Sequence, residues 1–428
     1  MVVLIDNNPP LSVESASSLN YYVSNMETSE DEDEISPTSD STNNSNRMRN
    51  HQTDNFHDAI ASWVVNSKTP AMHVDSLLRI LQTKAPDLPK TCKSLLQTPK
   101  NAFKNIVPMC QGSYLHIGLQ NILYTFLSTN NVSSRIITLD VGIDGTPSTN
   151  SSDTELWPIL VNVLGFEDIL LVGCYFGTGK PKDDAESPEE FLTPFVTEVL
   201  EILKNGGIVF QNESFELKFR AFVMDTPARA FIMNTLAHTG YHSCTKCTVV
   251  GMKIANRTVF HGVDYELRSN VTFRNRTHRN HHHSDAITMI ERLPIDCVKM
   301  VPVDPMHNVY MGVMKQLLLL WICQRKKPYS ISAKNIRLLS ERIVLIANQL
   351  PSEFCRKPRA LKLLKRFKAT EFRQFALYTM IILLEGLLPL NYYNHFLKFH
   401  CAVRILSTPD DCIRNNALAN DLMTDFTL

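Results

Sequence analysis

The sequence lacks an apolar run long enough to cross a membrane as a helix. Its two most apolar stretches, Val309–Ile322 and Tyr378–Leu390, are shorter than the roughly 20 residues that such a helix needs. They also contain Lys315 and Glu385. We therefore predict that both stretches are buried core helices and that the protein has no membrane partner.

The N-terminus lacks the features of a secretory signal. Met1–Ile5 is too short for the hydrophobic part of a signal peptide, and no basic residue precedes it. The ten cysteines are then expected in a reducing compartment, where thiols stay free or bind a metal rather than form disulfides.

The first 46 residues lack Lys and Arg, although the whole chain has a formal net charge of zero. They contain nine acidic residues, which leaves 43 basic and 34 acidic residues in the rest of the chain. Residues 1–54 are rich in Ser, Asn and Thr, and we predict a disordered acidic tail because they have too little apolar surface to bury. The basic excess of the remaining chain indicates a polyanionic partner.

The apolar periodicity divides the rest of the chain into four segments. Residues 55–125 are predicted to form a helical N-terminal subdomain, with two or three helices between Phe56 and Leu96. The first part of an α/β core follows at 130–236, and a Cys/His-rich insertion at 237–303. A helical segment at 304–428 is predicted to complete the core.

The 130–236 segment alternates between strand and helix patterns. A helix is predicted over Ser187–Lys204, because a capping-box sequence opens it and Asn205-Gly-Gly207 closes it. Strands are predicted over 134–142, 168–176, 207–211 and 217–224. This alternation predicts a mixed α/β sheet rather than an all-α fold.

Three carboxylates lie where a metal site could form. Asp144 follows the first predicted strand and Asp225 ends the last one, and open α/β sheets place ligand-binding groups at such strand ends. Glu371 begins a predicted helix, Thr370–Leu388, directly after a basic stretch. Together these acids could hold two Mg²⁺ or Mn²⁺ ions that activate a nucleophile in phosphoryl transfer. Taken singly, the aspartates also suit turns, and the glutamate suits a helix N-terminus.

The 238–307 region is rich in potential zinc ligands, because it holds eight of the fourteen histidines. Cys244 and Cys247 have the C-x₂-C spacing of half a structural zinc site. We name His238 and His282 as partners from a larger set of histidines. That set is His238, His242, His261, His278 and His281–His283. The alternative is two reduced cysteines in a turn beside a solvated basic loop.

Asp304 has two possible roles. It precedes Pro305 and can cap the helix that follows, which is the simpler interpretation. With His307 three residues later, it could instead offer a carboxylate and an imidazole to a metal.

Two basic stretches, Arg325–Lys327 and Arg356–Lys368, hold ten positive charges between them. The second leads directly into Glu371, and a nuclease-like site needs such a basic surface because it must neutralise the DNA backbone. We predict DNA contacts from seven of these residues, namely Arg356, Lys357, Arg359, Lys362, Lys365, Arg366 and Lys368. A solvated helix face is the alternative.

Five sequence blocks occur in an order that resembles a known family. They are Leu88–Thr98 with Gly112–His116, Ile143–Pro147 with Leu156–Leu160, Asp225–Arg229 with His238–Cys247, Asp304–His307 with Gly312–Val313, and Lys368–Arg373. Over roughly residues 55–405 the chain resembles the transposases of CACTA-type (En/Spm-like) DNA transposons, particularly the animal transposase-derived proteins of that superfamily. In that family we expect more helical sequence after the glutamate-bearing helix than this chain has before Leu428.

The resemblance implies an α/β fold with a ribonuclease H-like mixed sheet core of the DDE type. A Cys/His-containing insertion would follow the second acid, and helical segments would flank the core. In this core Asp144, Asp225 and Glu371 would bind the two Mg²⁺ (or Mn²⁺) ions. Asp304 is the rival for the second aspartate.

The resemblance also implies a structural zinc ion at Cys244 and Cys247, with a partner among His281–His283. The implied activity is the cutting and joining of DNA during transposition, with DNA as the partner, a homo-oligomeric state, and a nuclear or else cytoplasmic location. One alternative is a catalytically inactive, transposase-derived module that binds DNA or protein. Another is an unrelated metal-dependent hydrolase of small substrates.

Overall fold

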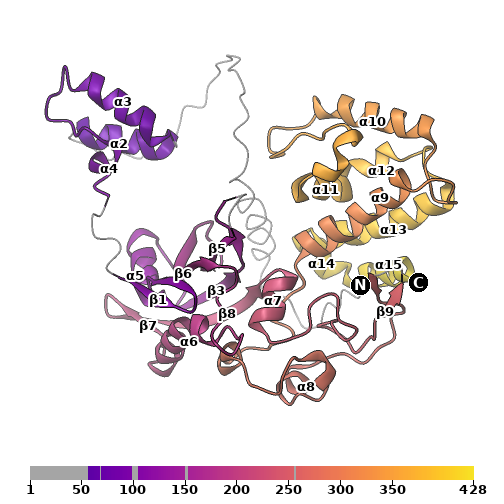
Figure 1. The fold of residues 1–428 in the computed structure, drawn as a ribbon, viewed down its shortest axis with the longest axis horizontal. Coiled ribbons are helices and arrows are strands. Elements are labelled where there is room, and N and C mark those ends of the chain that lie inside the picture. The colour runs from indigo at the N-terminus through magenta and orange to yellow at the C-terminus, as the bar shows by residue number, and fades with distance from the viewer. Residues whose placement is uncertain (1–55, 68, 99–104, 150–152, 255–256) are drawn as a thin grey trace. The chain divides into compact units, whose positions relative to one another are not determined.

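A computed structural model describes residues 56–67, 69–98, 105–149, 153–254 and 257–428 (Figure 1). The predicted acidic tail at 1–54 lies outside these residues. The described residues up to Asn105 form one compact unit, and those from Ile106 to Leu428 form another.

The first unit is a small group of helices, as the apolar spacing predicted. Its helices are α2 (Phe56–Ser67), α3 (Ala71–Leu81) and α4 (Cys92–Leu95). Pairs such as Val74 and Leu78 lie four residues apart on one helix face and are buried. The hydroxyl of Thr91 caps α4 by accepting a hydrogen bond from Ser94 N at 3.2 Å.

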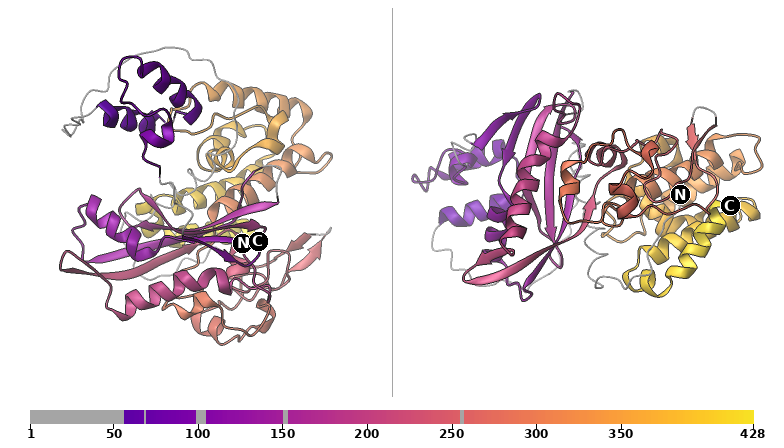
Figure 2. Two further views of the ribbon diagram at one scale, coloured as in Figure 1. Left: turned by 60° about the vertical axis from the view of Figure 1, so that its left-hand side comes forward. Right: turned by 90° about the horizontal axis from the view of Figure 1, so that it is seen from below.

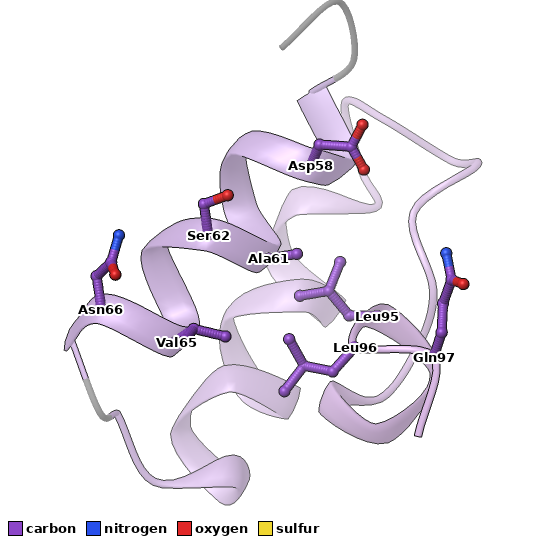
Figure 3. A pocket seen from close by; sticks show the side chains of 8 residues that line it. All are labelled: Asp58, Ala61, Ser62, Val65, Asn66, Leu95, Leu96 and Gln97. Atoms are coloured by element: carbon purple, nitrogen blue, oxygen red, sulfur yellow. The ribbon is translucent and has the colours of Figure 1, made fainter. Parts of the chain in front are cut away.

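A surface hollow of about 410 Å³ lies between α2 and the turn after α4 (Figure 3). Among the described residues that line it, Asp58 alone carries a charge. The other side chains are uncharged: they are aliphatic, such as Val65 and Leu95, or carry a hydroxyl or an amide, such as Asn66 and Gln97. The hollow therefore offers no set of groups for acid–base or metal chemistry.

The second unit is built on an eight-stranded mixed sheet within the described residues, which Figure 2 shows from two further directions. The strand order is β1-β2-β6-β5-β3-β8-β7, with β4 beside β5. β3 and β8 pair in parallel, and the other pairings in this sheet are antiparallel. The strands are β1 (Ile106–Met109), β2 (Gly112–His116), β3 (Ile136–Ile143), β4 (Thr146–Pro147), β5 (Thr154–Val163), β6 (Ile169–Thr178), β7 (Ile208–Phe210) and β8 (Glu213–Val223). The predicted mixed α/β class is thus confirmed.

The predicted strands at 134–142, 168–176, 207–211 and 217–224 correspond to β3, β6, β7 and β8. β5 was not predicted as a strand, and Pro158 within it argues against a central position. Nevertheless β5 pairs with both β3 and β6. Residues 106–125, which we assigned to the helical subdomain, instead contribute β1, β2 and part of a helix, Leu119–Thr129, to the α/β unit.

Helices α5 (Leu119–Thr129) and α6 (Glu189–Lys204) contact each other and the sheet. The apolar face of α6 is buried in the same core as the inward-facing strand residues. Glu198 of α6 accepts hydrogen bonds from Leu119 N at 2.7 Å and Gln120 N at 3.0 Å. A carboxylate at this helix N-terminus satisfies free amides and fixes α5 against α6.

Beyond β8 the chain forms helix α7 and then an insertion of short elements. A buried ion pair stabilises the insertion, with Arg276 Nη2 at 2.6 Å from Glu291 Oε1. The elements are α7 (Thr226–Ile232), β9 (Met252–Ile254), β10 (Arg257–Val259), α8 (Asn270–Arg274), and the 3₁₀ helices η2 (Arg279–His281) and η3 (Met289–Arg292).

The remaining chain is helical and has a hydrophobic core of its own. Two of its elements, η4 and η6, are π-helical. The elements are η4 (Met306–Met314), α9 (Lys315–Cys323), α10 (Ala333–Ala347), η5 (Leu361–Arg366, 3₁₀), α11 (Ala369–Gln374), η6 (Phe375–Thr379), α12 (Met380–Leu383), α13 (Leu390–Leu406), α14 (Pro409–Arg414) and α15 (Asn416–Thr427).

The long helix predicted over Thr370–Leu388 contains a π-helical segment and ends earlier than predicted. It consists of α11, the π-helical η6 and α12, and its last helical residue is Leu383. Gly386 adopts a left-handed backbone with φ of +70°, a conformation that commonly follows a helix end. The predicted helix is thus present from Ala369 to Leu383, and it ends five residues before the predicted Leu388.

The two most apolar stretches of the sequence lie within this helical core. In the first, Tyr310, Met314, Leu318 and Trp321 recur at helical spacing and are buried. No helix in the described part of the chain is both long and apolar enough to cross a membrane.

Candidate functional site

Asp144 and Asp225 follow paired positions of two parallel strands. Gly142 of β3 pairs with Val223 of β8, and each aspartate comes two residues later. Strands that run in the same direction end at the same edge of a sheet. The two aspartates therefore leave the sheet side by side, as their strand-end positions predicted.

A bulge in β8 produces this register. The pairing shifts by one residue between Leu139 and Asp140, and Arg220 is the extra residue of β8. Without the shift, Met224 would stand opposite Asp144 in place of Asp225. Arg220 Nε donates a hydrogen bond to Asp140 Oδ1 at 2.7 Å, and both side chains are buried.

Each aspartate also makes a local backbone hydrogen bond. Asp144 Oδ1 accepts from Gly145 N at 2.8 Å. Asp225 caps α7, because its Oδ1 accepts from Ala228 N at 2.6 Å. The two aspartates thus have the local turn and helix-capping roles that their sequence allows, and they also lie at neighbouring strand ends.

The electrostatics show that these acids share one environment. Burial and the charge of Asp225 raise the pKa of Asp144 to about 7, and Asp304 adds to this effect. The Gly145 amide and His307 act in the opposite direction. The structure therefore brings Asp144, Asp225 and Asp304 into one cluster with His307 beside them.

Asp304 is buried and caps the helix that follows it. Its carboxylate accepts hydrogen bonds from Met306 N at 2.8 Å and His307 N at 3.3 Å. The same carboxylate lies 2.5 Å from His307 Nδ1, and this bond raises the pKa of His307. The charges of Asp225 and Asp144 also raise the pKa of His307.

Glu371, the third predicted acid, has a different environment. Its side chain is fully buried, and its carboxylate accepts two hydrogen bonds from Arg359, at 2.9 and 2.7 Å. Lys368 N donates a third hydrogen bond at 2.9 Å. Among the described residues, Glu371 is not one of the groups that shift the pKa of Asp144. The main contacts of its carboxylate are with Arg359 and Lys368, and its place among the metal-binding acids stays a prediction.

The basic stretch before Glu371 has one buried and one exposed face. Leu361, Leu364 and Phe367 point into the helical core. Arg359 is paired with Glu371 and lies over the Phe367 ring. The exposed cations of the stretch are Lys357, Lys362, Lys365 and Arg366, while Arg356 and Lys368 are half-buried.

Cys244 and Cys247 form a close pair, with their Sγ atoms 3.5 Å apart. The hydrogen bond from Cys247 is the main cause that lowers the pKa of Cys244 to about 5, and the charge of Arg268 contributes. The same bond, together with burial, raises the pKa of Cys247. This environment favours one thiolate, the form of cysteine that binds metals.

The histidines near this pair differ in their surroundings. His281 is fully buried, its Nδ1 lies 2.7 Å from the carbonyl of His242, and its Nε2 has no partner among the described residues. His282 is also buried, whereas His238 is exposed. In the described part of the chain, no group of three or more His, Cys, Asp or Glu side chains is arranged to hold one metal ion.

The aspartate cluster and the cysteine pair offer different donor atoms, and these atoms suit different metal ions. Asp144, Asp225 and Asp304 offer carboxylate oxygens, which suit Mg²⁺ or Mn²⁺. Cys244 and Cys247 offer sulfur, which suits Zn²⁺. Histidines that bind zinc through one ring nitrogen usually form a hydrogen bond to a carbonyl or carboxylate through the other. His281 makes such a bond, between its Nδ1 and the carbonyl of His242.

Two cations near the aspartates were not predicted. Lys180 follows β6, and its Nζ donates to Pro227 O at 3.1 Å. Arg229 of α7 is buried, and its Nη1 has no partner among the described residues. Burial lowers the pKa of Arg229, although the charges of Asp304, Cys244 and Asp225 oppose this. The only sequence signal was their position, soon after a strand end and one helical turn after Asp225.

Comparison with known proteins adds no family assignment, because the sequence matches no protein-family model and no curated protein.

Proposed function

We propose that the protein is a DDE-type, transposase-like enzyme that cuts and joins DNA by metal-dependent phosphoryl transfer. The observation that carries this proposal is the in-register placement of Asp144 and Asp225 at the ends of two parallel strands. Carboxylates at one sheet edge can hold the metal ions that such chemistry uses.

The strand order supports a ribonuclease H-like core. The four long strands come in the chain order β3, β5, β6 and β8, and they lie in the sheet order β6-β5-β3-β8. The family resemblance implies a second aspartate at the end of the fourth strand, followed by an insertion. Asp225 follows β8 in this way, and the Cys/His segment comes after α7.

In this proposal Asp144, Asp225 and Asp304 would hold Mg²⁺ or Mn²⁺, which would activate a water or 3′-hydroxyl and stabilise the leaving oxygen. Asp304 takes the place that we first gave to Glu371, because its charge acts on Asp144 whereas Glu371 is bound to Arg359. Asp304 holds the His307 ring through Nδ1 and so orients that imidazole at the site.

DNA would meet the exposed cations Lys357, Lys362, Lys365 and Arg366. These charges can neutralise backbone phosphates without specifying a sequence. A nuclear location and a homo-oligomeric state are parts of the same proposal. A structural zinc ion would bind Cys244 and Cys247, with His281 as the histidine whose surroundings suit it best.

A second candidate function is a DNA-binding module that has lost catalysis. The observation that favours it is that no metal-holding group is preformed in the described residues. This module would show steep salt dependence of DNA binding but no strand cleavage.

The deciding experiment is cleavage of linear duplex DNA with Mg²⁺ or Mn²⁺, comparing the wild type with Asp144→Asn and Asp225→Asn. We expect the wild type to cut and both variants to be inactive. Binding without cleavage by the wild type would favour the module, and cleavage that survives both substitutions would exclude this site.

A further inference from the structure

Lys180 shares one sheet edge with the two aspartates. β5 is antiparallel to both β6 and β3, so β6 runs in the same direction as β3 and β8. β6 ends at Thr178, two residues before Lys180. All three strands run toward the end of the sheet that bears Asp144 and Asp225, but β6 extends five residues beyond the level of Ile143, because Ile143 and Gly173 both pair with Ile159. The side chain of Lys180, rather than its backbone, therefore has to reach the two aspartates.

The side chain of Lys180 is held in place by its surroundings. Its Nζ donates to Pro227 O at 3.1 Å, on the helix that Asp225 caps. The same nitrogen lies 5.8 Å from the ring centroid of Trp157 and 5.3 Å from that of Phe231, within the range of a cation–π contact.

Trp157 also ties this lysine to Asp144. Its ring lies 2.6 Å from the position that a Cβ on Gly145 would take, so residue 145 must be glycine for the ring to fit. Trp157 is thus packed against the residue that follows Asp144, while Lys180 lies over its ring.

The ammonium of Lys180 has hydrogen-bonding capacity left over. It has three N–H groups, and Pro227 O accepts one of them. In the described part of the chain no carboxylate lies within ion-pair distance of it, whereas the nearby Lys182 is paired with Glu186. Burial lowers the pKa of Lys180, and the charges of Asp225, Glu155 and Asp144 oppose that effect.

We propose that Lys180 binds a backbone phosphate of duplex DNA and positions that phosphate at the Asp144–Asp225 edge. This inference rests on the proposed function. A phosphodiester that approaches several carboxylates is repelled unless positive charge is supplied locally. Lysine acts as a point charge toward phosphate, and the aromatic rings restrict it to this position.

The test measures how the affinity for DNA depends on salt. Fluorescence anisotropy of a labelled linear duplex would be recorded over a range of NaCl concentrations with the full chain and Lys180→Met. Losing one phosphate contact should weaken binding and reduce the slope of log affinity against log salt by about 1. Lys180→Arg should keep most of the slope, because it keeps the charge.

Lys182→Met is the matched control, since Lys182 lies two residues away and is paired with Glu186. It should bind DNA with the wild-type slope. Circular dichroism and the melting temperature would establish that each variant is folded. Equal slopes for Lys180→Met and Lys182→Met would overturn the inference.

Cleavage separates this inference from the proposed function. If the wild type cuts DNA with Mg²⁺ and Lys180→Met binds and cuts equally well, the role of Lys180 is wrong and the function stands. If the wild type neither binds nor cuts DNA, the proposed function fails and this inference falls with it.

Discussion

The guanidinium of Arg220 is paired with the carboxylate of Asp140 at the bulge that brings Asp225 opposite Asp144. Arg220 Nε lies 2.7 Å from Asp140 Oδ1, and both side chains are buried. The ion pair thus occupies the point where the register of β3 and β8 shifts.

Removing one partner of this pair should destabilise the protein strongly. Arg220→Met leaves the buried carboxylate of Asp140 uncompensated, which typically costs about 3–5 kcal/mol. Urea unfolding would measure the loss. The double variant Asp140→Leu/Arg220→Met should lose less than the single change, because it leaves no unpaired charge.

The matched control is the ion pair between Arg135 and Glu213, which lies at the other end of the same strand pair and is exposed. Arg135→Met should change stability little, since solvent screens such pairs. An equal loss for Arg135→Met and Arg220→Met would contradict the role given to the buried pair.

Glu371→Gln should act on stability rather than on a metal site. The change removes the charged partner of Arg359 and weakens the cap of α11, at a cost of about 1–3 kcal/mol. Denaturant unfolding and Mn²⁺ binding by electron paramagnetic resonance would be compared. Glu385→Gln is the control, because Glu385 is exposed. Unchanged stability together with lost Mn²⁺ binding would restore Glu371 to the site.

Asp304→Asn should distinguish the helix-capping role of Asp304 from its proposed role in metal binding and catalysis. Asparagine caps helices about as well as aspartate, so the change in stability should stay below about 1 kcal/mol. The variant loses one negative charge from the cluster, and Mn²⁺ affinity and DNA cleavage should both fall. Wild-type Mn²⁺ affinity in a folded Asp304→Asn protein would remove Asp304 from the proposed metal ligands.

Asp144 should make stability depend on pH. Its pKa is about 7 in the folded protein against 3.8 ordinarily, so between these values the folded state binds more protons than the unfolded state. The free energy of unfolding should therefore decrease as pH rises from about 4 to 7. Asp144→Asn should remove this contribution and be more stable at pH 8 by roughly 1–2 kcal/mol, after allowance for partial exposure.

Urea unfolding at pH 5 and pH 8 in a chelator would test this prediction. The gain from Asp144→Asn should appear at pH 8 and nearly vanish at pH 5. A gain of equal size at both pH values would indicate a packing effect rather than a titration.

Zn²⁺ should bind the pair Cys244 and Cys247, and the affinity of this binding should depend on His281. Native mass spectrometry of the purified protein should detect bound Zn²⁺ that Cys244→Ser abolishes and His281→Ala weakens. His261→Ala is the control, because His261 is exposed. Retention of zinc in Cys244→Ser would show that the ion binds elsewhere.

Much of the α/β core could be predicted from local patterns. Continuous apolar runs indicated β3 and β6, and caps at both ends indicated α6. The π-helical segment in the helix after Lys368 could not be predicted in this way, because apolar spacing does not distinguish an α-helix from one that contains a π-helical turn.

In the candidate site, too, some features could be predicted from the sequence and others could not. The strand-end positions of Asp144 and Asp225 were visible in the sequence. The environment of Glu371 was not, since it depends on Arg359 folding back from twelve residues earlier. Lys180 and Arg229 were missed because their neighbours come from other strands and helices.

The sequence by itself determined the type of several core elements, among them β3, β6, β8 and α6, and placed two aspartates at strand ends. It could do so because hydrophobic periodicity and capping act over a few neighbouring residues. Only the tertiary structure decided which acids share a site. One inserted residue, Arg220, changes the face that every later residue of β8 presents. Whether a carboxylate is a candidate ligand or half of an ion pair depends on the partner that folding brings to it, as Asp304 and Glu371 show.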